Sequence, residues 1–341
     1  MERKYVSKDQ ASLLEVRKLE TAFRIEGKDY NAVDQVSFQV KPGKVIGVVG
    51  ESGCGKSVMS LSIMGLLPKG AGRVKGGEIL FDGKQLDQLS NQQMNKIRGK
   101  DITMIFQEPM TSLNPVFTIG YQLEEVLHNH FTITKKEARN KVIQLLAAVG
   151  ISRPEKVVLD YPHQLSGGMR QRVMIAMAIA CQPKLLIADE PTTALDVTVQ
   201  AQILELLKDI QRKNNMSIIL ITHDLGVVSE TCDEVLVMYA GRIVERTTVR
   251  NLFDKPLHPY TELLMGAIPK MEETVDTLET IEGIVPSLTN MPETGCRFAN
   301  RCPKAMEACS DITPVLAEEK SNHEVACLLY ESSKPRGGVT L

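Results

Sequence analysis

The feature that most constrains the fold is residues 50–57 (GESGCGKS). An apolar run at 44–49 (KVIGVV) precedes it, and a helix-compatible run at 58–67 (VMSLSIMGLL) follows it. A strand, a glycine-rich turn ending in GKS and a helix together predict a phosphate-binding loop. Its glycines let backbone N–H groups point inward at an anion, and the helix adds its positive dipole end. The predicted loop consists of Gly50, Glu51, Ser52, Gly53, Cys54, Gly55, Lys56 and Ser57.

Two side chains of this loop have specific expected roles. Lys56 can reach the outer phosphates of a nucleotide, and the Ser57 hydroxyl can bind Mg²⁺. Cys54 has no evident base nearby, so we interpret it as a small filler rather than a nucleophile.

Composition narrows the class of protein. A chain of 341 residues favours one large and one small domain. It is 43% apolar, and no apolar run reaches the length of a membrane span. Residues 1–10 (MERKYVSKDQ) contain no apolar stretch, so we expect no signal peptide. The net charge of −2 argues against a general nucleic-acid binder, and any membrane association would come through a partner.

The N-terminal part reads as an antiparallel sheet. Residues 13–23 and 36–40 alternate like strands, with a turn expected at 27–30, and residues 76–85 read as another hairpin. Such a sheet would place an aromatic side chain near the nucleotide base. Phe23 or Tyr30 could stack on adenine, and either could equally be ordinary core.

The middle of the chain predicts an α/β fold with a mostly parallel sheet. Buried strands at 101–106, 184–190 and 217–224 alternate with helical patterns, which include 197–214. A helical insertion is expected between 118 and about 150. Ligands bind such sheets at the carboxyl ends of the strands, where four polar residues fall: Gln107, Asp189, Glu190 and His223.

These four residues suit the hydrolysis of a nucleotide. Asp189 can orient the Mg²⁺ shell, and Glu190 can polarise the attacking water. Gln107 can bridge Mg²⁺ and water through its amide. His223 can donate to the γ-phosphate or hold Glu190 in place, although a lone histidine after a strand is more often structural.

Residues 165–171 (LSGGMRQ) predict a second anion site. Ser166 is placed as a helix cap, and the N–H groups of Gly167 and Gly168 lie at the same helix start. One nucleotide rarely needs two cradles from one chain. We therefore expect two chains to meet head to tail, each offering this turn to the γ-phosphate of the other; a helix cap without a ligand is the alternative.

The order of these motifs resembles the nucleotide-binding subunit of ABC transporters over about residues 12–260. The resemblance implies a hydrolysing ATPase in which residues 50–57 are the Walker A motif, Gln107 is the Q-loop and residues 166–171 are the signature. It further implies that Asp189 is the Walker B aspartate, Glu190 the catalytic base, Asp196 the D-loop residue and His223 the switch histidine. It also implies nucleotide contacts from four signature residues, Ser166, Gly167, Gly168 and Gln171.

Three further segments resemble oligopeptide and dipeptide importer ATPases, whose relatives include nickel importers. They are residues 108–115 (EPMTSLNP), 258–269 (HPYTELLMGAIP) and the cysteine-bearing tail. The resemblance implies a second ATPase subunit, favoured to be a different chain, two membrane permeases and an extracytoplasmic solute-binding protein. It places the chain peripherally at the cytoplasmic face of the membrane. Alternatives are import of nickel or another small solute, a soluble ABC-type ATPase acting on DNA or ribosomes, and a subunit that binds ATP without hydrolysing it.

Four of the seven cysteines gather near the C-terminus, namely Cys296, Cys302, Cys309 and Cys327. Four clustered cysteines in a reducing compartment favour a metal site over disulfides. Resemblance to family members thought to carry a [4Fe–4S] cluster favours that cofactor, with zinc or unmetallated thiols as alternatives. We expect Cys181 and Cys232 to be core residues.

The expected organisation has two parts. Residues 1–255 form the nucleotide-binding domain, with its helical subdomain at about 108–170, and residues 256–341 form a small loop-rich extension that carries the four cysteines. We expect a loose start at 1–12 and a disordered tail at 332–341.

Overall fold

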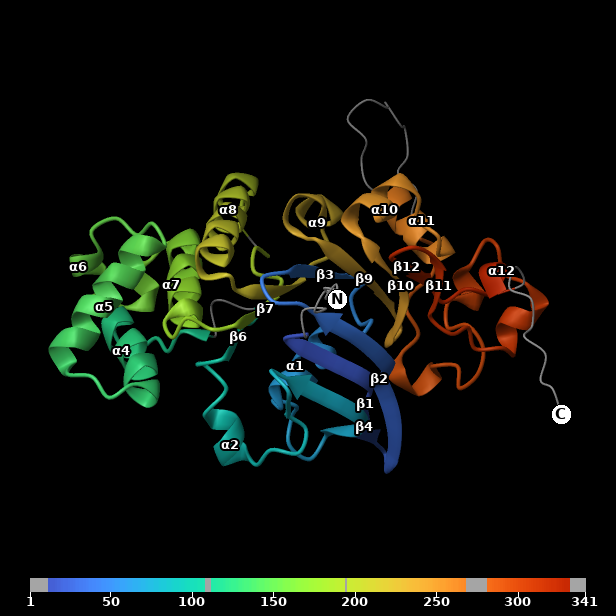
Figure 1. Cartoon of the computed structure of the whole chain (residues 1–341), viewed down its shortest axis with the longest axis horizontal. Coiled ribbons are helices and arrows are strands. Elements are labelled where there is room, and N and C mark those ends of the chain that lie inside the picture. The colour runs from blue at the N-terminus through green and yellow to red at the C-terminus, as the bar shows by residue number, and fades with distance from the viewer. Residues whose placement is uncertain (1–11, 108–111, 194, 268–280, 332–341) are drawn as a thin grey trace, which may run out of the picture.

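The computed structural model describes residues 12–107, 112–193, 195–267 and 281–331. Two sheets form the centre, with a helical arm on one side and the C-terminal extension on the other (Figure 1). The expected C-terminal tail and all but one residue of the expected loose start fall outside the described residues. Among the described residues, no helix combines the length and apolar character needed to cross a membrane.

The smaller sheet is antiparallel and has four strands in the order β2-β1-β4-β5. Its strands are β1 (Leu14–Ile25), β2 (Lys28–Val40), β4 (Gly72–Phe81) and β5 (Lys84–Gln85). The expected hairpin at 76–85 is confirmed, but the turn expected at 27–30 is wrong because β2 begins at Lys28. Glu26 and Gly27 turn the chain instead, and both have positive φ (49° and 83°), as a tight two-residue hairpin turn requires.

The larger sheet has eight strands in the order β11-β12-β10-β9-β3-β8-β7-β6. Its strands are β3 (Val45–Val49), β6 (Ile102–Ile105), β7 (Leu185–Asp189), β8 (Ser217–Ile221), β9 (Glu234–Tyr239), β10 (Arg242–Thr248), β11 (Ala317–Lys320) and β12 (His323–Val325). Strands β9, β3, β8, β7 and β6 run parallel, as the sequence predicts. The other three pair antiparallel at one edge.

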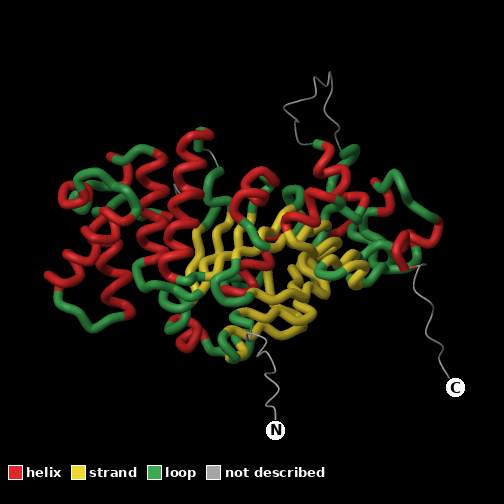
Figure 2. The backbone as a smooth tube through the Cα atoms, turned by 45° about the horizontal axis from the view of Figure 1, so that its top comes forward, coloured by secondary structure: helices red, strands yellow, loops and turns green. Residues whose placement is uncertain are grey.

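Each face of the larger sheet is covered by a different layer. Ile218 and Leu220 of β8 pack in a core with the helical arm, whereas Ile219 and Ile221 pack in a core with β1, β2 and α1. This alternation follows from the two-residue repeat of a strand whose faces are both buried. Figure 2 shows helices on several sides of the strands, with the helical arm as the large group at the left. The central helices are α1 (Lys56–Met64), α2 (Asn91–Asn95), α8 (Val197–Asn214), α9 (Leu225–Thr231) and α10 (Val249–Asp254).

The expected helical insertion is present and contains more than one helix. Thr118 caps the first helix, and Thr134 caps the second in a capping box with Glu137. The arm then runs into the helix that follows Ser166. Its helices are α4 (Ile119–His130), α5 (Lys135–Ala148), α6 (Pro154–Val157) and α7 (Gly167–Ile179).

The C-terminal extension is fastened to the larger sheet. Strand β12 pairs with β10, and β11 pairs with β12, so the extension lengthens that sheet. The sequence did not indicate these strands, because four and three residues are too few to show a periodicity. Helices α11 (Pro259–Gly266) and α12 (Leu328–Glu331) complete it.

Candidate nucleotide site

The loop at residues 50–57 has the predicted form. It leaves β3 at Val49 and enters α1 at Lys56, with Gly55 at the N-cap. Gly50 and Gly55 have φ angles of 149° and 101°, which side chains rarely adopt. A Cβ at Gly50 would lie 2.2 Å from the Met238 carbonyl oxygen, so only glycine fits there.

Lys56 is held by two backbone carbonyls from the start of its own loop. Its side chain is buried, and Nζ donates to the Gly50 carbonyl at 2.6 Å and to the Glu51 carbonyl at 3.0 Å. Carbonyl oxygens are weaker partners for an ammonium than phosphate oxygens are. The lysine is therefore placed to exchange these contacts for a phosphate.

Cys54 is buried beside Lys56, with Sγ 3.7 Å from Nζ. Burial raises the pKa of the Cys54 thiol above its ordinary value, so the thiol stays protonated. This agrees with the prediction that Cys54 is a filler rather than a nucleophile.

Asp189 carries the observation that fits a divalent cation. It ends β7 and is 4% exposed, and its Oδ1 is buried without a hydrogen-bond partner among the described residues. Burial raises its pKa, while a hydrogen bond from Ser57 acts the other way. A buried carboxylate oxygen beside a hydroxyl is the oxygen donor set that Mg²⁺ prefers.

Glu190 is the centre of a hydrogen-bonded group. Its Oε2 accepts from Gln107 Nε2 at 3.0 Å and from Thr193 Oγ1 at 2.9 Å. Its Oε1 lies 3.4 Å from His223 Nδ1. The predicted residues Gln107, Glu190 and His223 are thus brought together, and Thr193 is an addition that the sequence analysis missed.

The environment of Glu190 keeps its side chain ionised. Burial opposes ionisation, but the Thr193 hydrogen bond and the charge and hydrogen bond of His223 outweigh it. The pKa of Glu190 therefore lies below its ordinary value. Its backbone has a φ of 48°, a strained value for a non-glycine residue that is typical of functional sites.

A cavity of 350 Å³ connects the loop with this group. Phe23 lines it and Tyr30 does not, so of the two aromatic residues considered for stacking on adenine only Phe23 lies at this cavity. Leu288, from the C-terminal extension, also lines it and was not foreseen. The remaining lining residues are Ala32, Ser52, Gly53, Cys54, Gly55, Lys56, Ser57, Val58, Gln107 and Glu190.

The turn at Ser166 lies away from this cavity. The Ser166 hydroxyl accepts a hydrogen bond from Met169 N at 3.3 Å and caps α7, as predicted. Ser166 and Gly167 are exposed, and neither lines the cavity. The turn therefore lies outside the cavity beside the phosphate loop, and its expected contact with a second chain stays a prediction.

Two other predicted contacts have structural partners here. Gln171 is 1% exposed, and its Nε2 donates to the Pro191 carbonyl at 2.5 Å. Gln171 is thus buried within its own chain, where it links α7 to the segment that follows Glu190, and its expected contact with a nucleotide stays a prediction. Asp196 caps α8 by accepting from Val199 N at 2.9 Å.

The four C-terminal cysteines are free thiols. Cys296 N donates to the Cys309 carbonyl at 2.8 Å, which joins two turns of the extension. Burial raises the pKa of Cys327 to about 11, and the other three C-terminal cysteines raise it further. Among the described residues, no three metal-ligating side chains are arranged to share one metal ion.

The other two cysteines agree with the expectation of core positions. Cys181 is 8% exposed, and Cys232 packs against two of the apolar cores. Burial raises the pKa of Cys232 to about 12, so that thiol is inert as well.

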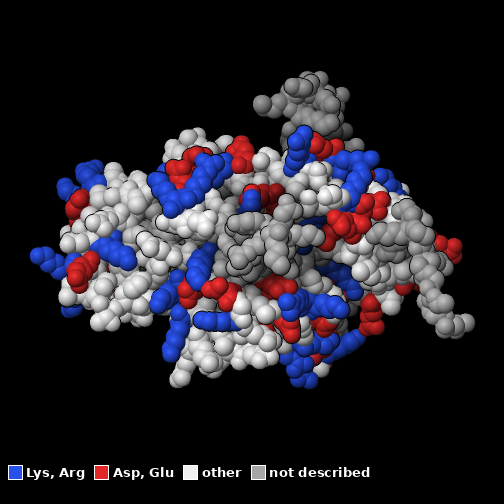
Figure 3. Space-filling model, viewed as in Figure 1, with Lys and Arg blue, Asp and Glu red and all other residues white. Residues whose placement is uncertain are grey.

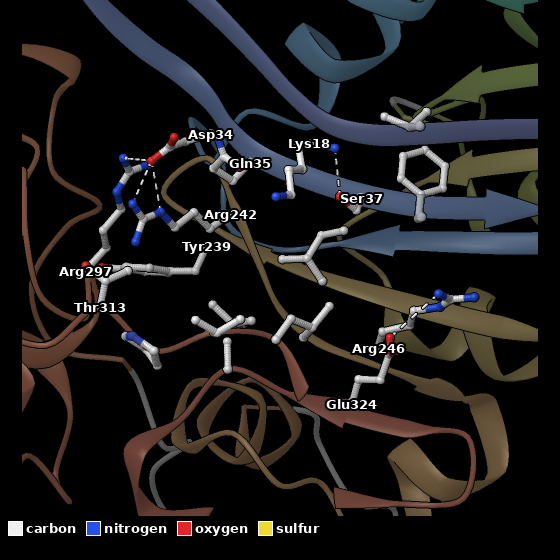
Figure 4. A pocket seen from close by; sticks show the side chains of 18 of the residues that line it. Lys18, Asp34, Gln35, Ser37, Tyr239, Arg242, Arg246, Arg297, Thr313 and Glu324 are labelled. Carbon is white, nitrogen blue, oxygen red and sulfur yellow. Dashed lines mark hydrogen bonds and ion pairs between the residues drawn. The ribbon is translucent and has the colours of Figure 1, made fainter. Parts of the chain in front are cut away.

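A larger cavity of 670 Å³ lies between β1, β2 and the C-terminal extension. Figure 4 shows Asp34 there between two guanidinium groups. Arg242 donates to Asp34 Oδ2 at 2.8 Å, and Arg297 donates to the same atom at 2.5 Å. This cavity is separate from the phosphate loop, and its charged groups serve to join the extension to the smaller sheet.

Comparison with known proteins identifies the family to which the chain belongs. The family model described as ABC transporter matches residues 33–193. The chain is 55% identical over 321 residues to the oligopeptide transport ATP-binding protein AppD of Bacillus subtilis, covering 94% of this chain and 98% of that protein. The chain belongs to the ABC transporter family of ATP-binding subunits. It is an ATPase, as the sequence predicts.

Two further comparisons place this ABC ATPase more closely. A model described as oligopeptide/dipeptide transporter, C-terminal region, matches residues 244–309. The dipeptide transport ATP-binding protein DppD of Bacillus subtilis is 51% identical, with 94% of this chain and 95% of that protein covered.

The fold agrees with a solved ABC cassette. The ATP-binding cassette MJ0796, in a dimeric post-hydrolysis state bound to ADP and Pi, is 27% identical with a TM-score of 0.62. The match covers 70% of this chain and 99% of that chain.

Proposed function

We propose that this ABC ATPase couples ATP hydrolysis to the uptake of dipeptides or oligopeptides. The observation that carries the proposal is the C-terminal match at residues 244–309. It is joined by relatives that are named for peptide transport and that this chain matches over nearly their whole length. These relatives favour transport over a role on DNA or ribosomes. On the face in Figure 3, basic and acidic side chains are interspersed, which offers no single-sign surface for a nucleic acid.

The chemistry follows from the site. The glycine loop receives the phosphates, and Lys56 exchanges its carbonyl contacts for the outer phosphates. The ionised Glu190 accepts a proton from the attacking water, whose oxygen bonds to the γ-phosphorus while the bond to the ADP oxygen breaks. Gln107, Thr193 and His223 hold the carboxylate in place. When bound at Asp189 and Ser57, Mg²⁺ supplies positive charge to the phosphates.

The partners are part of the proposal. The exposed turn at Ser166 suits a head-to-tail dimer with a second ATPase, favoured to be a different chain. In that dimer each chain would offer this turn to the γ-phosphate bound by the other. Two permease subunits would place the pair at the cytoplasmic face of the membrane, with a solute-binding protein outside. Asp196 lies at the start of α8 and would contribute to the same dimer.

An exposed aromatic pair supports permease docking on the helical arm. Phe117 and Tyr121 are 41% and 50% exposed, and their rings stack with centroids 4.7 Å apart. Val116 beside them is 69% exposed. Exposed apolar side chains grouped in this way mark interaction surfaces. Residues 108–111 of the neighbouring segment 108–115 lie outside the described residues.

A [4Fe–4S] cluster on the four cysteines is the finer part of the proposal. The four thiols supply the donor type that iron–sulfur clusters use. Among the described residues, no three metal-ligating side chains are positioned to share one ion, so metal content decides between a cluster, zinc and free thiols. Anaerobic protein should contain about four irons and four acid-labile sulfides per chain, lost in Cys302→Ser. Zinc alone, or no metal, would refute the cluster and leave the ATPase assignment intact.

Uptake in cells tests the transport role. A strain lacking this subunit should lose uptake of a labelled dipeptide or of a labelled oligopeptide. Wild-type protein should restore it, and Glu190→Gln should not. Nickel uptake is measured in the same strains to test the alternative that the transporter imports nickel. If nickel uptake alone is lost, nickel and not peptide is the solute. Unchanged uptake of both peptide classes would refute the proposal.

A further inference from the structure

Glu51, in the phosphate-binding loop, is held on three sides. Its N–H donates to Tyr260 Oη at 2.8 Å, and its carbonyl accepts from Lys56 Nζ at 3.0 Å. Its carboxylate accepts two hydrogen bonds from Arg301, at 2.7 Å from Nη1 and 3.0 Å from Nη2. Tyr260 and Arg301 both belong to the C-terminal extension, so that extension fixes the start of the loop.

Arg301 is a rigid support for this contact. Its side chain is 7% exposed. Nε donates to the Glu282 carbonyl at 2.8 Å, and Nη1 also donates to Tyr239 Oη at 3.2 Å. The guanidinium lies 5.7 Å from the centre of the Tyr239 ring. Because these contacts fix the guanidinium plane, the two-point pairing sets both the position and the direction of the Glu51 carboxylate.

The segment that carries Arg301 is bounded by two cysteines, Cys296 and Cys302. Its Phe298 is 1% exposed and packs against Tyr260, with ring centroids 5.3 Å apart. A second arginine of the segment, Arg297, donates to the Ala240 carbonyl at 2.5 Å and pairs with Asp34 (Figure 4). The segment is thus anchored to the cassette independently of Glu51.

Binding of a nucleotide changes which of these contacts remain. Lys56 must leave the Gly50 and Glu51 carbonyls to reach a phosphate. Glu51 then keeps its contacts with Tyr260 and Arg301, and its carbonyl still accepts from Cys54 N at 3.3 Å. The contacts with Tyr260 and Arg301 therefore keep the loop in the shape that receives the phosphate after Lys56 has left the loop carbonyls.

We propose that Arg301 is a positioning residue of the ATP site, which holds the phosphate-binding loop in its binding shape through Glu51. The cysteine-bounded segment 296–302 is then part of the nucleotide site, although it touches no nucleotide. The proposal concerns ATP binding and is independent of which solute is transported. Loss of the contact should weaken nucleotide affinity more than turnover at saturating ATP, because Glu190 and its partners are untouched.

The test is a double-mutant cycle on the purified full chain. We compare wild type, Arg301→Gln, Glu51→Gln and the double variant by the binding of a fluorescent ATP analogue and by kcat and KM for ATP. Each single variant should weaken affinity roughly three- to tenfold, with kcat changed less than about twofold. The double variant should lose no more than the single ones, since both remove the same contact. Arg301→Lys should fall between, because an ammonium cannot form the two-point pair.

A matched control separates positioning from general damage to the extension. Lys304 lies close to Arg301 in sequence and pairs with Glu262 at 2.5 Å on the surface. Lys304→Gln should keep wild-type affinity. If Arg301→Gln does not fold, Glu51→Gln decides, because it leaves the other Arg301 contacts intact. Wild-type affinity in Glu51→Gln, or additive losses in the double variant, would overturn the proposal.

Discussion

Gln107 Nε2 lies 3.0 Å from Glu190 Oε2, so the second residue after β6 is joined to the first residue after β7. Neighbouring parallel strands place these two side chains at one edge of the sheet. The same oxygen accepts from Thr193, and the other oxygen faces His223. Glu190 is therefore oriented from three sides, and its neighbours come from three separate segments of the chain.

Replacing Lys56 should weaken nucleotide binding. In Lys56→Met the ammonium that is directed at the phosphates is lost, while its aliphatic volume is kept. We expect ATP affinity to fall about tenfold or more, the size of one charged hydrogen bond. Equilibrium binding of a fluorescent ATP analogue measures this. Wild-type affinity in a folded variant would contradict the assigned role.

The turn at Ser166 should affect ATP hydrolysis only in the two-chain assembly. Ser166→Ala removes a helix cap worth about 1 kcal/mol, and Thr134→Ala removes a comparable cap of α5. Both variants should lose similar stability in thermal unfolding. In the assembled dimer, Ser166→Ala should slow hydrolysis by about tenfold, whereas Thr134→Ala should not. Equal hydrolysis rates in the two variants would argue against a phosphate contact by this turn.

Glu245 should be a major anchor of the C-terminal extension. It is fully buried and accepts from Leu257 N and His258 N, both at 2.9 Å, and it lies 2.6 Å from His323 Nε2. Glu245→Gln weakens all three contacts and leaves buried donors poorly paired. We expect the free energy of unfolding to fall by about 3–5 kcal/mol in denaturant titrations. A change below about 1 kcal/mol would show that the extension is held mainly by its apolar contacts.

Stability should decrease on acidification between pH 6.5 and 4. Burial lowers the pKa of His258 from 6.5 to about 4. In that window the unfolded chain binds a proton that the folded chain does not, so stability rises with pH and is lost as pH falls. The shift corresponds to about 3 kcal/mol. His258→Asn keeps an acceptor for the Tyr260 N–H and removes the titration, so its unfolding midpoint should vary less with pH. An unchanged pH dependence would contradict this.

Glu245 adds to the same trend at lower pH. Burial favours its neutral form, but the His323 hydrogen bond and the backbone donors outweigh burial and lower its pKa below 4.5. A lowered carboxyl pKa contributes stability above the unfolded value, and that stability is lost as pH falls through the folded value.

The nucleotide site could be predicted because its chemistry is local in sequence. Residues 50–57 fold as one turn whose glycines are needed at fixed positions. Asp189, Glu190 and His223 follow buried strands, and parallel strands place their carboxyl ends together. The helix caps at Ser166 and Asp196 likewise follow from side chains within three residues.

What escaped prediction depends on contacts between distant segments. Arg301 reaches Glu51 from 250 residues away, and no periodicity marks such a pair. Leu288 lines the nucleotide cavity for the same kind of reason. Gln171 is buried because α7 packs against the segment after Glu190, a position that the helix pattern alone does not fix. Tyr30 and Phe23 face each other across one hairpin, yet only Phe23 lines the cavity.

The most direct measurement is single-turnover hydrolysis of labelled ATP by wild type and Glu190→Gln at equal ATP occupancy. The replacement keeps the size and the hydrogen-bonding capacity of the side chain but removes its ability to accept a proton. If Glu190 is the base, the rate should fall about 10²- to 10⁴-fold while ATP affinity is kept. Full turnover in the Glu190→Gln protein would contradict the role of Glu190 as the base.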